Sequence, residues 1–253
     1  MLNKTDNDLL FHLNFNPKQF RADYAILPGD PGRVDEIAAC LDYSVPVAYN
    51  REFKIVRGEV GAKEVFVCST GIGGPSTAIA MEELAMAGVT TFIRVGTCGG
   101  INVDVNGGDI VVATSAVRQE GTSLHYAPIE YPAAANFDVV KALHDTAQYY
   151  GSKVHTGVVQ CKDSFYGQHS PETMPVDYEL LNKWEAWKKL GVLASEMESA
   201  TLFTVANKLG VRAGTILSVV WNQERAKTLL PTLEVHDTST VSRIAVEAIR
   251  NML

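Results

Sequence analysis

Short apolar runs alternate with amphipathic helical stretches along the whole chain, and this alternation constrains the fold more than any single motif. Apolar strand-like runs occur at residues 24–27, 91–95 and 213–221. Between such runs apolar residues recur at helical spacing, as in residues 136–150. No linker or change of composition interrupts the pattern. We therefore expect one α/β domain over residues 1–253, with helices flanking a mixed central β-sheet.

The other expected elements follow the same alternation. Two strand-like runs, 53–60 and 64–69, flank a short turn and predict a β-hairpin. Further strands are expected at 109–117, 154–161 and 192–194, and further helices at 75–87, 178–190, 235–252 and in the segment ending at Lys208. Ligands of α/β folds gather at the carboxyl ends of strands, where the candidate residues below are placed.

Composition and charge exclude several classes of protein. A chain of 253 residues with 46% hydrophobic content can bury a large core. No apolar run approaches the roughly 20 residues of a membrane helix, and the first residues lack a secretory h-region, so we expect a cytoplasmic protein. A net charge of -7 argues against a broad nucleic-acid surface. The four cysteines show neither CxxC nor metal-ligand spacing and fit reduced thiols.

Residues 193–201 place two carboxylates on either side of Met197 at a strand-to-helix connection. Neither Glu196 nor Glu198 has a basic residue within five positions. Residues two apart lie on the same side of an extended backbone, so both carboxylates can face one pocket and accept hydrogen bonds from a sugar. Alternatively, Glu198 only favours a helix N-terminus, where negative charge is stabilised. Spacing alone leaves both interpretations open.

Two glycine-containing turns precede helices. In the first, Gly29 and Arg33 can hold a small anion through backbone N–H groups and a guanidinium fork, although an ordinary tight turn has the same pattern. The second, residues 70–76, lacks both the P-loop lysine and a full GxGxxG, so it is weak evidence for nucleotide binding.

Arg94 interrupts a strand that otherwise reads as buried. Burying an arginine costs several kcal/mol unless an anion or a carboxylate pairs with it. A bound anion and an internal ion pair are equally compatible with the sequence. Thr97, at the end of the same strand, adds a hydroxyl.

Six short motifs occur in the order found in one enzyme family. They lie at residues 29–33, 50–53, 68–76, 94–97, 165–168 and 196–199. Together they make the chain resemble the nucleoside phosphorylase family, in particular its uridine phosphorylase branch, over nearly its whole length. The resemblance implies a ring-shaped hexamer of dimers, in which a neighbouring subunit completes each active site.

The resemblance also implies ligands for phosphate, the co-substrate, and for ribose. Phosphate would be held by Gly29, Arg33, Arg94 and Thr97, with Arg51 reaching in from the adjacent subunit. The ribose would contact Glu198, Glu196, Met197 and, from the neighbour, His12. For His12 the alternative is an ordinary half-buried histidine.

Base and cation contacts follow from the same resemblance. Phe165 would stack near the base, and Gln168 would recognise its polar edge. No organic cofactor is implied, but a monovalent cation such as K⁺ would lie at the dimer seam near Glu52, Ile72 and Ser76. The implied partners are a small nucleoside, phosphate and further copies of this chain, with neither nucleic acid nor membrane.

The chain departs from the family at the base pocket. Uridine phosphorylases usually carry Gln-x-Arg there, whereas this chain reads Gln168-His169-Ser170. The missing arginine removes a charge-assisted donor worth roughly 1.5 to 3 kcal/mol. Lys162 is the candidate replacement, with His169 less favoured. The alternative for Lys162 is a solvated charge at the end of a strand.

These expectations define a reaction and its competitors. We expect reversible phosphorolysis of uridine to uracil and ribose 1-phosphate, with Arg94, Glu198 and Lys162 as the catalytic residues. The alternatives are a purine nucleoside phosphorylase with an altered base pocket and a nucleoside-binding protein without turnover. Purine-cleaving relatives have a proton-donating aspartate where this chain has Asn222, although Glu224 is near.

Overall fold

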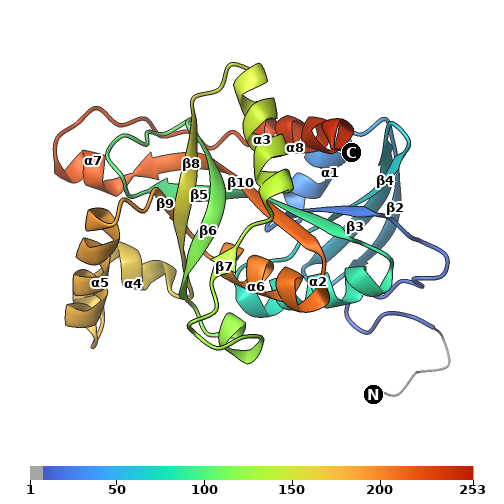
Figure 1. Cartoon of the computed structure of the whole chain (residues 1–253), viewed down its shortest axis with the longest axis horizontal. Coiled ribbons are helices and arrows are strands. Elements are labelled where there is room, and N and C mark those ends of the chain that lie inside the picture. The colour runs from blue at the N-terminus through green and yellow to red at the C-terminus, as the bar shows by residue number, and fades with distance from the viewer. Residues whose placement is uncertain (1–7, 253) are drawn as a thin grey trace.

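The computed structural model describes residues 8–252, and Figure 1 shows their arrangement. Residues 1–7, on which the expectation about export partly rests, and residue 253 lie outside the described part. The strands are β1 (Tyr24–Pro28), β2 (Tyr43–Asn50), β3 (Phe53–Val60), β4 (Lys63–Cys68), β5 (Thr91–Gly100), β6 (Ile110–Gln119), β7 (Ala133–Ala134), β8 (Val154–Lys162), β9 (Ala194–Glu196) and β10 (Arg212–Asn222). The α-helices are α1 (Gly32–Ala38), α2 (Gly74–Met86), α3 (Phe137–Tyr149), α4 (Phe165–His169), α5 (Asp177–Lys189), α6 (Ser199–Leu209), α7 (Gln223–Lys227) and α8 (Ser239–Asn251).

A mixed sheet forms the centre of the molecule. The strand order is β10-β6-β8-β9-β5-β1-β4-β3-β2, and β7 pairs with β6. β1 runs parallel to β4 and β5, whereas β3 runs antiparallel to β2 and β4. β10 pairs with β5 as well as with β6. The strands β5, β10, β6, β8 and β9 therefore close into a ring, which the alternation of strands and helices does not reveal.

Helices cover the strands on two sides, each with its own apolar core. α2 and α6 contribute Met81 and Phe203 to one cluster. α1, α3 and α8 contribute Ile37, Leu143 and Ile244 to the other. In Figure 1 the first group of helices lies below the strands and the second above them. The fold class expected from the sequence, a mixed α/β domain whose central sheet is flanked by helices, is confirmed.

Several expected elements form with nearly the expected bounds. The hairpin forms from β3 and β4, which pair antiparallel. α3 begins after Asn136, whose side chain accepts a hydrogen bond from the backbone N–H of Asp138. α6 ends at Gly210, which adopts a left-handed φ of 70° and closes the helix.

Three of the differences from the sequence predictions have a local physical reason. β2 was not predicted, because it is a partly exposed edge strand whose short apolar run is interrupted by Pro46. The last helix begins at Ser239 instead of residue 235, since the Asp237 carboxylate accepts the Ser239 N–H at 2.8 Å and fixes the start there. α4 forms where no helix was predicted, because the Ser164 side chain caps it by accepting the N–H of Gly167 at 2.9 Å.

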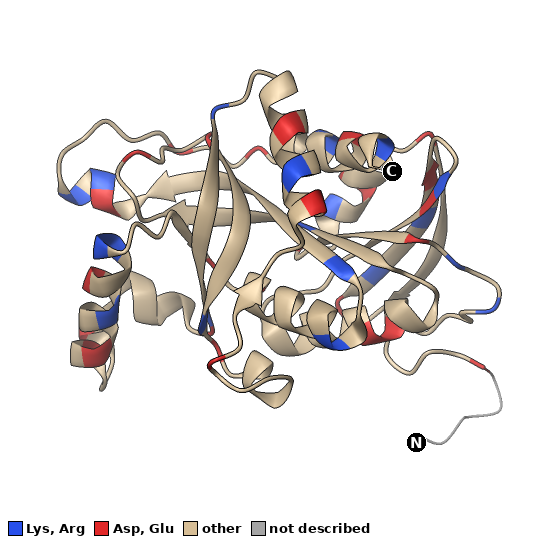
Figure 2. Cartoon of the chain, viewed as in Figure 1, with Lys and Arg blue, Asp and Glu red and all other residues tan. Residues whose placement is uncertain are grey.

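Acidic and basic residues are interspersed over the elements (Figure 2). α5, for example, carries Asp177 and Glu179 in its first turn and Lys188 and Lys189 in its last, which complements its dipole. Because the two signs of charge are mixed over the surface, attraction for an anion must come from a few local arginines.

Within the described residues, no helix combines the length and apolar character needed to cross a membrane.

Candidate active site

A cavity of about 1280 Å³ opens where β1, β5, β8, β9 and β10 end. Twelve of the residues singled out from the sequence line it: Gly29, Arg33, Ile72, Arg94, Thr97, Lys162, Phe165, Gln168, His169, Glu196, Met197 and Glu198. They come from segments spread over most of the chain. The volume is ample for a nucleoside and an anion together.

Arg94 and the two carboxylates of residues 193–201 form the centre of this cavity. The Arg94 Nε donates to Glu196 Oε2 at 2.9 Å, and its Nη2 lies 2.5 Å from Glu198 Oε2. All three residues are at most 5% exposed. Arg94 thus has the internal ion pair that its burial requires, and it still lines the cavity where an anion can reach it.

The carboxylates of Glu196 and Glu198 have different hydrogen-bond partners. Glu196 accepts hydrogen bonds from the backbone N–H groups of Glu198 and Ser199 at 3.0 Å, so it serves the start of α6. Glu198 occupies the N-cap position of that helix, yet its side chain does not cap it. Instead Glu198 Oε1 accepts the N–H of Gly73 at 2.6 Å. The helix-start interpretation therefore applies to Glu196, and Glu198 keeps lone pairs for a ligand.

Burial shapes the charge states of this group. Burial raises the pKa of Glu198, Arg94 offsets part of that rise, and Glu196 adds to it. For Arg94, burial alone lowers the pKa, but the charges of Glu198 and Glu196 outweigh burial and raise it. Burial lowers the pKa of Arg33, and the like charge of Arg94 lowers it further. An anion bound between the two guanidinium groups relieves this repulsion.

Lys162 is buried at the end of β8, where it begins a hydrogen-bonded chain. Its Nζ donates to Ser195 Oγ at 2.7 Å, and Ser195 Oγ donates to Gln168 Oε1 at 2.6 Å. Burial lowers the pKa of Lys162, and the charges of Glu196 and Glu198 limit the decrease. The interpretation of Lys162 as a solvated strand-end charge is therefore wrong.

Phe165 and His169 lie on α4 at the mouth of the cavity. Their ring centroids are 4.3 Å apart. Burial lowers the pKa of His169, and the nearby charge of Lys162 lowers it further. An imidazole held neutral in this way cannot replace the charge of the missing arginine, which leaves Lys162 as the better candidate.

Two of the predicted phosphate and ribose ligands do not line this cavity within the described chain. Arg51 lies exposed on the turn between β2 and β3, with a positive φ of 55°. His12 is held by Glu83, whose Oε1 lies 2.7 Å from His12 Nδ1 and whose two oxygens accept the backbone N–H groups of His12 and Leu13. The resemblance assigns both residues to the site of a neighbouring subunit.

The residues expected to hold a cation lie close together. Glu52 and Ser76 both lie next to Gly71. If Gly71 carried a Cβ atom, that atom would be 3.0 Å from Glu52 Cγ and 3.6 Å from Ser76 Oγ. Ser76 Oγ is also 3.5 Å from the carbonyl oxygen of Ile72. Such oxygen donors suit a hard cation. No group of three or more His, Cys, Asp and Glu side chains in residues 8–252 could hold a metal ion.

Sequence reasoning missed Ser195 and Glu83 as candidate site residues. Ser195 adjoins Glu196, but residues one apart face opposite sides of a strand, so the pattern offers no signal for a link to Lys162. Glu83 lies on α2 and is 7% exposed. A carboxylate in a helix made mostly of apolar residues is a signal that could have found it.

Comparison with known proteins gives matches over nearly the whole chain. The phosphorylase superfamily matches residues 23–250. A uridine phosphorylase of Treponema pallidum is 48% identical over 246 residues, which cover 97% of this chain and 95% of that protein. The uridine phosphorylase of Escherichia coli is 44% identical over 250 residues, covering 96% and 98%. A guanosine phosphorylase of Halorubrum lacusprofundi is 44% identical over 200 residues, covering 79% and 78%.

Proposed function

Because the chain belongs to the phosphorylase superfamily, we propose that it catalyses the reversible phosphorolysis of uridine to uracil and ribose 1-phosphate. The observation that carries this proposal is the position of Arg94. Its guanidinium lies beside Glu198 in a cavity that Arg33 also lines, so an anion and a sugar can be bound side by side. That arrangement suits attack of phosphate on the anomeric carbon.

Phosphate would bind between Arg33 and Arg94, with Gly29 and Thr97 supplying further donors. Arginine holds tetrahedral anions through paired hydrogen bonds, which fixes the direction of an oxygen as well as its position. No side chain needs to attack the sugar, because the bound phosphate is the nucleophile. The contribution of the protein is to hold it beneath C1′, and such positioning lowers the barrier by several kcal/mol.

Glu198 would accept hydrogen bonds from the ribose 2′- and 3′-hydroxyls, while Met197 packs on the sugar. As the bond to the base breaks, the ring gains oxocarbenium character, and the carboxylate stabilises the growing positive charge. The hydrogen bonds of Glu196 hold Arg94 and the start of α6. We therefore place Glu196 behind the ribose contacts, as a support for Glu198.

Lys162 would stabilise the base as it leaves. Negative charge develops on uracil when the glycosidic bond breaks, and donors aimed at its carbonyl groups act as an oxyanion hole does. The chain from Lys162 through Ser195 to Gln168 places an ammonium and an amide at the same pocket. Phe165 would pack against the base at the mouth.

The proposal extends to the assembly. We propose a hexamer in which Arg51 and His12 of one subunit enter the site of its neighbour, since neither lines the cavity of its own chain. Glu52, Ile72 and Ser76 would hold a monovalent cation, whose charge would neutralise Glu52 at the seam between subunits. A cytoplasmic location fits the four free cysteines.

The guanosine phosphorylase relative makes a purine nucleoside phosphorylase the second candidate. Base release from uridine and from inosine, each measured with and without phosphate, separates the possibilities. We expect uridine cleavage that requires phosphate. Cleavage of inosine alone would favour the purine activity, and tight nucleoside binding without base release would indicate a binding protein.

A further inference from the structure

Ser195 lies at the end of the large cavity that we propose to bind the base. It is the middle residue of β9, and it pairs with Gly99 of β5 on one side and with Gln160 of β8 on the other. Strands on both sides thus hold its backbone, and the residue is only 3% exposed. The hydroxyl group is therefore presented from a fixed position.

The hydrogen-bond chain through Ser195 has one direction. Lys162 Nζ can only donate, so Ser195 Oγ accepts from it at 2.7 Å. The hydroxyl proton is then donated to Gln168 Oε1, which lies 2.6 Å away. If the Gln168 amide were turned round, Ser195 Oγ would receive two donors and its own proton would lose this acceptor.

This direction fixes which atoms of Gln168 a ligand meets. The amide oxygen is held toward Ser195. The amide nitrogen lies beside Gly99, since a Cβ atom on Gly99 would be 4.0 Å from Gln168 Nε2. Gly99 lines the large cavity, as Gln168 and Lys162 do. A ligand at this end therefore meets the Nε2–H groups of Gln168 and the remaining protons of the Lys162 ammonium.

Nearby side-chain oxygens already accept hydrogen bonds within the protein. Gln119 Oε1 accepts from Gln160 Nε2 at 2.7 Å and from Trp187 Nε1 at 3.1 Å. Ser164 Oγ accepts the N–H of Gly167 at 2.9 Å. This end of the cavity therefore offers a ligand more donors than acceptors.

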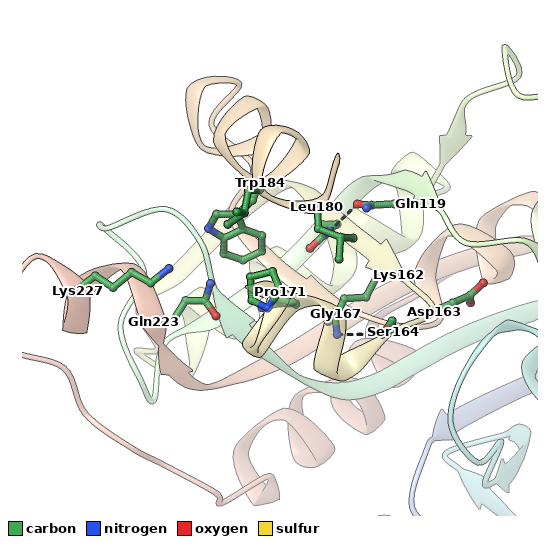
Figure 3. Close-up of a pocket in the computed structure, with 13 residues that line it drawn as sticks. Gln119, Lys162, Asp163, Ser164, Gly167, Pro171, Leu180, Trp184, Gln223 and Lys227 are labelled. Atoms are coloured by element: carbon green, nitrogen blue, oxygen red, sulfur yellow. Dashed lines mark hydrogen bonds between the residues drawn. The ribbon is translucent and has the colours of Figure 1, made fainter. Parts of the chain in front are cut away.

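A smaller cavity of about 180 Å³ adjoins the same end and shares Lys162 and Gln168 with the large one. Figure 3 shows the side chains around it, with Gln223 across the small cavity from Lys162. At about 30 Å³ for each water molecule, this space has room for about six waters. A small substituent that projects between Lys162 and Gln168 can therefore be accommodated.

We infer that Ser195 is a positioning residue, which turns Gln168 so that a pyrimidine base is recognised through its carbonyl oxygens and not through N3. In uracil, N3–H lies between two carbonyl groups. Donors from Lys162 and Gln168 match the two oxygens, whereas the Gln168 oxygen is turned away from N3–H. Nucleosides of N3-alkylated uracil, such as 3-methyluridine, are then substrates as well as uridine. This inference rests on the proposed phosphorolysis.

The test compares uridine with 3-methyluridine, which differs from it only by a methyl group in place of the N3 proton. With phosphate present, we expect wild-type kcat/KM for the two nucleosides to agree within about tenfold. In Ser195→Ala the Gln168 amide is released and can turn its oxygen toward N3–H. Only uridine gains this hydrogen bond, so the ratio of kcat/KM for uridine to that for 3-methyluridine should rise about fivefold over wild type.

Two further variants control for effects of the substitution itself. Ser195→Thr keeps the hydroxyl group and suits a strand, so it should retain the wild-type ratio. Ser44→Ala, at a half-buried position on β2, is the matched control and should change kcat/KM for neither nucleoside. A purely structural role of Ser195 would lower both values by the same factor in Ser195→Ala. That result would overturn the inference, as would failure of wild-type protein to cleave 3-methyluridine while it cleaves uridine.

Calorimetric titration with the free bases separates this inference from the proposed function. If uridine is not cleaved, but uracil and 3-methyluracil bind wild-type protein with similar Kd and Ser195→Ala favours uracil about fivefold, the proposed function fails and the inference stands. If uridine is cleaved and 3-methyluracil does not bind, the inference fails and the proposed function stands.

Discussion

The two ends of the large cavity are built on different principles. At the end proposed to bind sugar and phosphate, Arg94 pairs with both carboxylates, at 2.5 to 2.9 Å. At the end proposed to bind the base, the buried Lys162 donates to the Ser195 hydroxyl, and Gln160 Oε1 has no hydrogen-bond partner among the described residues. The first end tolerates few changes because each residue supports the others. The second end relies on neutral side chains around one buried lysine.

Arg94→Met should have the largest effect, because it removes the cation between two buried carboxylates. Removing one partner of a buried ion pair lowers the free energy of unfolding by about 3 to 5 kcal/mol. Activity should fall below detection, since phosphate loses its main ligand. Urea unfolding and a uridine phosphorolysis assay measure the two effects, with exposed Arg243→Met as the control. Stability near that of the wild type would show that the carboxylates are neutralised in another way.

Glu198→Gln should preserve the fold and reduce catalysis. Hydrogen bonds to a charged acceptor are worth about 1.5 to 3 kcal/mol each, so we expect kcat/KM for uridine to fall about 100-fold. For 2′-deoxyuridine, which has one hydroxyl fewer, the loss should be about tenfold smaller. Exposed Glu130→Gln serves as the control. Equal losses for both nucleosides would remove Glu198 from ribose recognition.

Lys162→Met should lower kcat/KM for uridine by at least about tenfold, because the leaving base loses a charged donor. Burial lowers the pKa of Lys162, so the ammonium is present at low pH and is lost as pH rises through that lowered value. Wild-type activity should therefore fall on the alkaline side below the ordinary lysine pKa of about 10.4. In Lys162→Arg this fall should move to higher pH. Exposed Lys189→Met should leave the pH profile unchanged.

Glu83→Gln should have the smallest effect, because it acts through His12, which we propose to reach the site of a neighbouring subunit only at its edge. Glu83 orients the imidazole through Nδ1. Losing that orientation weakens one hydrogen bond to the 5′-hydroxyl, which we expect to raise KM for uridine about fivefold with little change in kcat. For 5′-deoxyuridine, which lacks that hydroxyl, KM should be the same in Glu83→Gln as in the wild type. A matching rise for both nucleosides would mean that Glu83 only stabilises the local fold.

The sequence predicts the sugar and phosphate end better than the base end, for a physical reason. A charge in an apolar strand needs a partner, so the sequence alone indicates that Arg94 is paired or binds an anion. Its partner Glu196 lies 102 positions away, and only the fold identifies it. The base end depends on neutral groups such as Ser195, Gln160 and Gln119. Neutral polar residues are common on half-buried strands, and their hydrogen-bond direction depends on neighbours that the sequence does not place.

The ring of strands also determines when the site comes into existence during folding. β5 pairs with β10, and residues such as Gly96 and Leu217 meet only after more than a hundred intervening residues have been arranged. Loop closure of this kind is entropically costly and slows folding. Helices and the local β3–β4 hairpin can form early, but a chain with an open ring cannot have a working cavity. Recovery of phosphorolysis during refolding should therefore lag behind recovery of helical circular dichroism, and the lag would time the closing of the ring.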